Sequence, residues 1–165
     1  MRTLLILILL TATLGAQDVV IKDFIKEHRR GEENVALTVP GFLIGLASSI
    51  AVTAAEDDDE RALFRLLGDL GTVRMVTYEN ADFRRPEASI GNLLYSLERY
   101  RGFERWAELR TQDGTRITLT VRYHKKKIRE ILTILTEDDR TTLVAAKAQL
   151  SAEELGRVVN DLESL

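Results

Sequence analysis

The chain has 165 residues, of which 45% are hydrophobic and 30% are charged, and its net charge at neutral pH is −3. This length and composition are typical of one globular domain with its own core, and they exclude fibrous and low-complexity proteins. The charge argues against a nucleic-acid surface, which needs clustered Lys and Arg. The absence of cysteine excludes disulfides, thiolate metal sites and a cysteine nucleophile.

Residues 1–16 have the pattern of a secretory signal peptide. Arg2 supplies a positive start, Leu4–Leu10 is an unbroken apolar run, and small residues lead to Gly15-Ala16. The run is shorter than the roughly 20 residues that cross a bilayer. We therefore predict cleavage after Ala16, export to the periplasm or the exterior, and a mature domain of residues 17–165 without a transmembrane segment. The alternative is a buried N-terminal helix or strand.

The next segment predicts a helix and a strand. Asp18 can cap the helix, and an apolar stripe follows on one face: Val20, Ile21, Phe24, Ile25 and His28. We interpret His28 as a packing residue at the boundary of the core rather than a ligand, because no second histidine lies nearby in the sequence. Alternating Val35, Leu37 and Val39 then predict the first strand.

Residues 41–55 are apolar and rich in small side chains. Gly41, Gly45 and Ser49 recur every fourth residue, so one helical face would let another backbone approach closely. Small residues at this spacing also favour helix association in lipid. The segment is too short to span a bilayer, however, and it lies between a strand and an acidic run. We therefore predict a buried core helix.

The acidic run Glu56–Glu60 opens the next predicted helix. A calcium loop would need spaced oxygen ligands and a turning glycine, and neither follows here. Carboxylates at a helix N-terminus instead meet free N–H groups and the positive end of the helix dipole. Leucines then repeat at helical spacing: Leu63, Leu66, Leu67 and Leu70.

Residues 72–78 predict the second strand, and a helix follows from Pro86 to a left-handed cap at Gly102. Three turn signals then divide residues 104–150 into four strands. These turn signals are residues 112–115, 124–127 and 137–140. Asp113-Gly114 is typical of a tight primed turn, which needs positive φ at both central residues. Short connections force antiparallel pairing, so we predict a four-stranded meander. Ser151 and Glu154 then form a capping box that opens the last helix.

The order of these elements predicts an α+β domain. We expect a largely antiparallel sheet with the C-terminal four-stranded meander and with helices packed mainly on one face. Only the first two strands could pair in parallel, through a helical crossover.

No segment carries a catalytic motif. Ser48 and Ser49 lie in the apolar helix without a GxSxG elbow, and no phosphate-binding glycine loop is present. His28 and His124 lack the spacing of a zinc site. We therefore assign no catalytic, metal or cofactor-binding residue and expect no cofactor.

The predicted turn at 124–127 is the most distinctive surface feature. The candidate residues for partner contact are Arg122, His124, Lys125, Lys126, Lys127 and Arg129. A basic tip can meet an anionic surface or an acidic patch on an envelope protein. The alternative is that the lysines only keep an exposed turn soluble. A second candidate contact surface groups Trp106 with Arg105, Arg110 and Tyr100.

The chain resembles an uncharacterised family of exported bacterial proteins, the domain of unknown function 4252. The likeness covers nearly all of the mature chain. Besides the leader and the short helix after it, it rests on Val35–Pro40 before the apolar helix, Thr72–Glu79, and Leu150–Leu155 after the late strands. The resemblance implies export in Gram-negative bacteria, and it brings no established activity or site residue.

Two functions follow from the sequence. We expect an exported, non-enzymatic protein that binds an envelope partner or an anionic surface. The alternative is a small periplasmic hydrolase or carbohydrate-active enzyme whose carboxylates converge only in the folded chain. A cleft that contains clustered, buried carboxylates would favour the enzyme.

Overall fold

The computed structural model describes residues 19–31, 33–54, 61, 65, 68–111 and 114–163, without the side chains of 158–163. The predictions for the signal peptide, the cap at Asp18, the acidic run and Leu63, Leu66 and Leu67 therefore lie outside the described residues. Within the described part of the chain, no helix is both long and apolar enough to cross a membrane.

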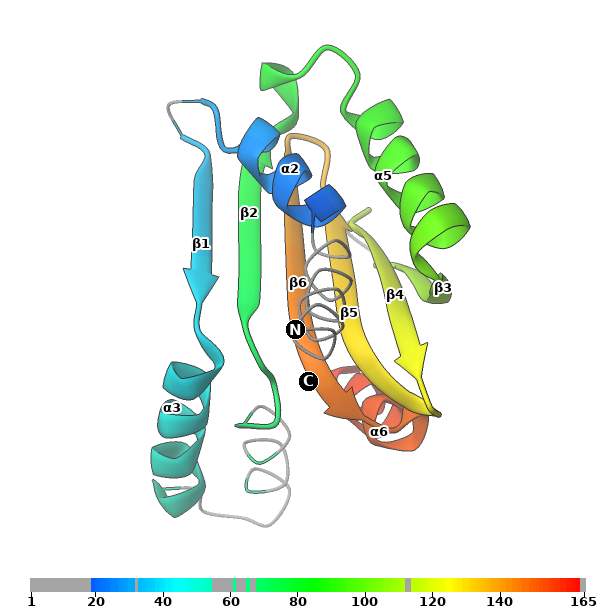
Figure 1. Cartoon of the computed structure of the whole chain (residues 1–165). Helices are drawn as coiled ribbons and strands as arrows, with labels where there is room; N and C mark the ends of the chain where they lie inside the picture. The colour runs from blue at the N-terminus through cyan, green and yellow to red at the C-terminus, as the bar shows by residue number, and fades with distance from the viewer. Residues whose placement is uncertain are drawn as a thin grey trace, which may run out of the picture.

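Six antiparallel strands form one sheet in the order β1-β2-β6-β5-β4-β3 (Figure 1). Their bounds are β1 (Val35–Val39), β2 (Val73–Glu79), β3 (Phe103–Arg110), β4 (Arg116–His124), β5 (Lys127–Thr136) and β6 (Arg140–Leu150). The last four strands are the predicted meander, and each pairs with the next along the chain. The structure thus confirms the α+β class and the antiparallel sheet.

The first two strands pair antiparallel, with Leu37 opposite Met75, so the parallel pairing considered for them does not occur. Helix α3 (Gly41–Ala54) leaves the end of β1, and the chain returns to begin β2 at that same end (Figure 1). A connection that goes out and comes back reverses the strand direction, unlike a crossover. Strand β2 then pairs with β6, with Met75 opposite Val144, which joins the early strands to the meander.

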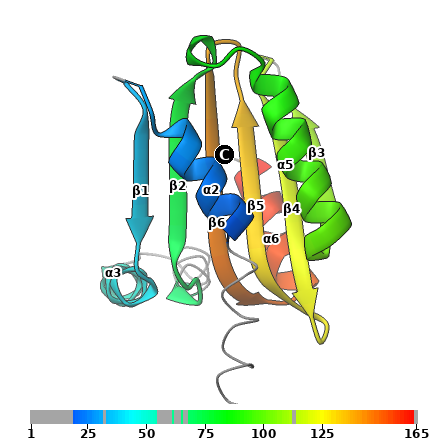
Figure 2. The ribbon, with the colours of Figure 1, turned by 45° about the horizontal axis from the view of Figure 1, so that its top comes forward.

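Two helices, α2 (Val19–His28) and α5 (Pro86–Arg101), cover one face of the sheet (Figures 1 and 2). The main core lies between them and the sheet and includes Ile21, Phe24, Val76, Tyr78, Leu93, Leu97, Leu132, Ile134 and Leu143. Helix α6 (Ala152–Glu163) lies on the opposite face. Its Leu155 packs in a smaller cluster with Leu119, Val121 and Ile128. The sheet therefore has helices on both faces, and the larger core is on the side of α2 and α5.

His28 is a packing residue, as predicted, but it lies in the core and not at its boundary, with 1% of its surface exposed. Its ring stacks on Phe24 at 3.8 Å between centroids and on Phe83 at 4.4 Å, and it lies 4.6 Å from the ring of Tyr78. Burial raises the pKa of Tyr78 to about 12. These rings fix α2 to β2 and to the segment before α5.

Helix α3 is not the buried core helix that its sequence predicts. Phe42 is 74% exposed, and Ser48 is its one buried residue. The small residues do allow close approach, because a Cβ at Gly41 would lie 2.9 Å from the backbone of Gly71. The helix lies beyond the end of the sheet (Figure 1), so the described helices α2, α5 and α6 do not cover its large apolar side chains.

The predicted cap at Gly102 and the predicted capping box of α6 are confirmed. Gly102 caps α5 in the left-handed conformation at φ 68°, and its N–H donates to the carbonyl of Leu97. In the capping box of α6, the Glu154 N–H donates to Ser151 Oγ at 3.1 Å, and the Ser151 N–H donates to the Glu154 carboxylate at 2.6 Å.

The turns of the meander differ from the prediction in one respect. Gly114 has positive φ, 93°, as expected, but its N–H donates to the Thr111 carbonyl, so Gly114 ends the turn and is not central to it. The two-residue turn with positive φ at both positions lies at Lys125 (50°) and Lys126 (66°) instead. His124 and Lys127 pair at the ends of that turn.

Candidate functional site

A groove of about 730 Å³ lies between α5 and the sheet. One wall is the first half of α5 with the loop before it, and the other is formed by β3 and β4. The turn between β5 and β6 closes one end. Four arginines line the groove: Arg85, Arg105, Arg110 and Arg116.

The register of the β3–β4 hairpin determines where two of these arginines lie. Arg110 is the Cα partner of Arg116 across the ladder, and Glu108 is the partner of Thr118. Residues directly opposite each other in an antiparallel pair place their side chains on the same face. The two guanidinium groups therefore lie side by side on the groove side of the hairpin.

The arginines of the groove differ in their partners. Arg105 pairs with Glu98 of α5 at 3.2 Å and with Glu108 at 3.4 Å. Arg85, Arg110 and Arg116 form no ion pair or side-chain hydrogen bond with any residue in the described part of the chain. Like charges directly opposite each other in a sheet are destabilising, so Arg110 and Arg116 carry an electrostatic cost that no ion pair relieves in the described part of the chain.

Helix α5 directs its N-terminus toward the groove. Pro86 occupies its first turn, and the capping residue Arg85 makes no side-chain cap hydrogen bond. The first N–H groups of a helix lack intrahelical partners, and the helix dipole adds positive potential there. Glu87 lies in the same turn and partly compensates this potential. Farther along the helix, Ile90 and Leu94 give the wall an apolar surface.

The floor of the groove is held by a hydrogen-bond network. The buried Thr141 hydroxyl donates to Asn80 Oδ1 at 2.7 Å. The Asn80 amide then donates to the carbonyls of Glu137 at 2.9 Å and Asp138 at 3.2 Å. The 3-10 helix η2 (Asn80–Asp82) is thereby tied to the β5–β6 turn, which gives the groove a fixed end.

Carboxylates also line the groove, at Glu87, Glu108, Glu137 and Asp138, and all four are exposed. General-acid catalysis by a carboxylate needs burial or another environment that holds its proton near neutral pH. The described residues also contain no group of three or more side chains that could hold a metal ion. The four arginines and the N-terminus of α5 give the groove groups that can bind an anion.

The predicted contact residues of the β4–β5 hairpin do not all lie together. His124, Lys125, Lys126 and Lys127 are exposed at the tip, at the opposite end of β4 from the groove. Arg129 lies beside them and donates to Gln149 Oε1 at 2.9 Å. The tip therefore presents one basic surface, separate from the groove.

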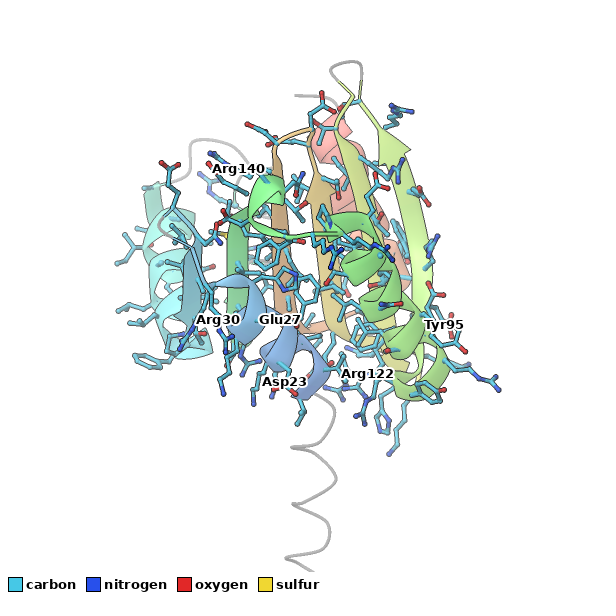
Figure 3. The ribbon with its side chains drawn as sticks, turned by 90° about the horizontal axis from the view of Figure 1, so that it is seen from above. Asp23, Glu27, Arg30, Tyr95, Arg122 and Arg140 are labelled. Carbon is cyan, nitrogen blue, oxygen red and sulfur yellow. The ribbon has the colours of Figure 1, made fainter. Side chains whose placement is uncertain are left out.

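Arg122 is the member of the predicted set that does not belong to the tip. It lies on the side of the sheet that carries α2 and α5 (Figure 3), and its side chain is 16% exposed. Its guanidinium is 2.5 Å from the Glu130 carboxylate and 6.0 Å from the centre of the Phe103 ring. The Arg122 side chain points toward the sheet face instead of toward the hairpin tip because the Glu130 carboxylate and the Phe103 ring lie within its reach.

The second predicted contact surface is divided between the two faces of the sheet. Arg105 and Arg110 line the groove, whereas Trp106 packs on the opposite face with the cluster around Leu155. Alternation along β3 places Trp106 on the opposite face from Arg105, and the β-bulge between Arg105 and Ala107 returns Arg110 to the face of Arg105. Neither Arg85 nor Arg116 was among the predicted contact residues. The predicted two-residue turn at Asp113-Gly114 would place Arg110 opposite Ile117, so it does not indicate that Arg110 and Arg116 face each other.

No protein-family model matches the chain, and no curated protein matches it either. The resemblance to the domain of unknown function 4252 thus stays a prediction.

Proposed function

We propose that this chain is an exported, non-enzymatic binding protein whose arginine-lined groove holds an acidic peptide segment of an envelope partner. The observation that carries this proposal is the pair Arg110 and Arg116, opposite each other across β3 and β4 without an ion-pair partner in the described part of the chain. Export is supported by the pattern of residues 1–16 alone.

Arginine suits this role because of its shape. A guanidinium group presents a planar fork of donors that matches the two oxygens of a carboxylate. A carboxylate between Arg110 and Arg116 would replace their mutual repulsion with two charge-assisted interactions. Arg85 and the N-terminus of α5 supply a second position for negative charge, because helix N-termini attract anions.

The rest of the groove suits a peptide rather than a free ion. Its volume of about 730 Å³ is far larger than a single carboxylate needs and lies within the roughly 300–1,000 Å³ of ligand pockets. Ile90 and Leu94 offer apolar contact, and the hydroxyls of Thr118 and Thr136 offer hydrogen bonds. A peptide can use both kinds of contact through its side chains and its backbone.

The exposed acids of the groove restrict which peptide fits. Glu87, Glu137 and Asp138 repel a segment in which every residue is acidic. Repulsion of this kind contributes to specificity as much as attraction does. We therefore infer that the preferred segment has acidic residues separated by apolar ones, so that its carboxylates reach the arginines and its apolar side chains reach Ile90 and Leu94.

The test is the binding of a fluorescent Glu-Leu-Glu-Leu-Glu peptide, measured by anisotropy at several salt concentrations. The double variant Arg110→Gln/Arg116→Gln should bind at least about tenfold more weakly, since a hydrogen bond to a charged group contributes about 1.5–3 kcal/mol. Binding to the unaltered protein should weaken as salt rises, because exposed charges are screened.

Two control variants locate the effect. Arg99→Gln removes an exposed arginine from the last turn of α5, outside the groove, and should leave binding unchanged. The triple change of Lys125, Lys126 and Lys127 to Ser removes the charges of the hairpin tip. If this triple variant loses binding while the groove variant keeps it, the contact surface is the tip and the groove proposal is wrong.

A further inference from the structure

A surface without charge occupies one edge of the molecule. Residues 35–54 contain no charged side chain, although 30% of the whole chain is charged. They form β1 and α3, which lie at the same edge (Figure 1). Six large apolar side chains of this stretch are exposed: Val35, Leu37, Phe42, Leu43, Leu46 and Ile50. An apolar surface of this extent is typical of an interaction site.

The surface includes a free sheet edge. Among the described strands, β1 pairs with β2 alone, so the backbone N–H and C=O groups of its outer side have no strand partner there. Proteins protect such edges with charged side chains, proline or a bulge. Strand β1, Val-Ala-Leu-Thr-Val, has none of these within its bounds.

The opposite edge of the sheet shows the contrast. Strand β3 carries Glu104, Arg105, Glu108 and Arg110, contains a bulge and packs beside α5. These are the devices that prevent a strand from pairing with another chain. One edge of the sheet is thus protected, and the edge at β1 has no further strand partner among the described residues.

The chemistry of this surface limits what can cover it. A lipid bilayer would leave the free backbone groups of β1 without partners, which is costly in hydrocarbon. Helix α3 also lacks the Lys, Arg, Trp and Tyr residues that anchor a helix at a membrane interface. A charged protein segment would find no opposite charge along residues 35–54. An uncharged strand satisfies both the backbone and the apolar side chains.

We propose that the partner is a second copy of this chain, whose β1 pairs antiparallel with β1 around a two-fold axis at Leu37. This register places Val35 opposite the partner's Val39, Ala36 opposite the partner's Thr38, and Leu37 opposite the partner's Leu37. The valines and leucines then share one face of the joined sheet, and no like charges meet. A two-fold interface requires this self-complementarity.

The exposed surface is large enough for such a dimer. In the antiparallel arrangement, each α3 follows the end of β1 and lies beside the beginning of the partner's β1. If the six exposed side chains are covered at roughly 100 Å² each, two copies bury about 1,200 Å², the lower limit for stable interfaces. We therefore expect a dimer that dissociates in the micromolar range.

The two-fold axis at Leu37 permits a direct test by light scattering coupled to size exclusion. The unaltered protein should have twice the monomer mass at high micromolar concentration. Leu37→Lys and Leu37→Glu should each be monomeric, because like charges would lie opposite each other at the axis. An equimolar mixture of the two variants should again give a dimer. Leu37 is 45% exposed, so these changes leave the core intact.

Leu109→Lys is the matched control, since Leu109 is a 37% exposed leucine on the protected edge strand β3. It should leave the dimer unchanged. Circular dichroism and the melting temperature verify that each variant folds. A monomeric unaltered protein, a Leu37→Lys variant that remains dimeric, or a mixture that fails to recombine would each overturn the proposal. Binding of a monomer to phosphatidylcholine vesicles would also overturn it and would assign the surface to membranes.

Discussion

Arg110 and Arg116 are opposite each other across the β3–β4 ladder, and both line the groove beside α5. Because their repulsion opposes folding, Arg116→Gln should raise the free energy of unfolding by about 0.2–1 kcal/mol. The same change should weaken peptide binding. Urea denaturation and the anisotropy assay measure the two effects.

An increase in stability together with a loss of binding is typical of a functional residue. Arg99→Gln, the control outside the groove, should change neither quantity by more than a few tenths of a kcal/mol, as for ordinary surface positions. If Arg116→Gln lowered stability, Arg116 would have a structural partner, and the argument for a free anion site would fail.

The buried ring of His28 predicts a pH dependence of stability. In neutral His28 both ring nitrogens form a hydrogen bond. Nδ1 donates to the Phe24 carbonyl at 2.8 Å, and Nε2 accepts from the Ser89 hydroxyl at 3.2 Å. Burial lowers the pKa of His28 below 6.5, against the opposing effects of the Phe24 carbonyl and the Glu27 charge. A proton thus binds the unfolded chain more tightly than the folded one.

The contribution of His28 is therefore fully present above the unfolded pKa of 6.5 and is lost as the pH falls toward the lower folded value. The free energy of unfolding should decline as the pH falls below about 7. His28→Phe keeps an aromatic ring without a titrating group and should flatten this slope. His124→Gln, at the exposed tip, should leave it unchanged. A slope that survives His28→Phe would assign the effect to another group.

The β4–β5 turn holds two lysines in the left-handed conformation, at Lys125 and Lys126. The left-handed conformation costs a residue with a Cβ roughly 1–2 kcal/mol. Asn-Gly is the preferred pair for such a turn. Lys125→Asn/Lys126→Gly should therefore raise the free energy of unfolding by about 1 kcal/mol or more. Thermal denaturation tests this expectation, and an unchanged or lower melting temperature would refute it. Peptide binding should remain as in the unaltered protein.

Arg122 and Glu130 form a pair with little exposed surface, 16% and 11% of their side chains. Removing one partner leaves a buried charge, so Arg122→Met should cost about 3 kcal/mol or more. Replacing both, with Arg122→Met/Glu130→Leu, should recover most of that loss because the unpaired carboxylate is also removed. A double-mutant cycle measures the coupling. If the two single effects simply add, the pair makes no net contribution to stability.

Local signals in the sequence were sufficient for much of the fold. The alternation of Val35, Leu37 and Val39 predicted β1, and Pro86 and Gly102 marked the two ends of α5. Turn residues divided the meander correctly. Each of these features depends on residues close together in the chain, where periodicity, caps and turn preferences determine the structure.

Long-range features could not be read from the sequence in the same way. The apolar composition of α3 predicts that the helix is buried. It does not indicate that the helix extends past the end of the sheet. The predicted two-residue turn at Asp113-Gly114 would place Arg110 opposite Ile117, whereas the observed register places Arg110 opposite Arg116. The turn prediction also does not indicate that α5 lies beside these residues and makes a groove. The burial of Arg122 is also a long-range feature, because its partners Glu130 and Phe103 come from the two neighbouring strands.

The groove proposal is tested most directly by a titration of isotopically labelled protein with the Glu-Leu-Glu-Leu-Glu peptide, followed by NMR. Amide shifts should concentrate at Arg85, Gly91, Arg110, Arg116 and Thr141, which line the groove. They should be reduced in Arg110→Gln/Arg116→Gln. Shifts confined to residues 124–127, or none at all at millimolar peptide, would contradict the assignment of the groove as the binding site.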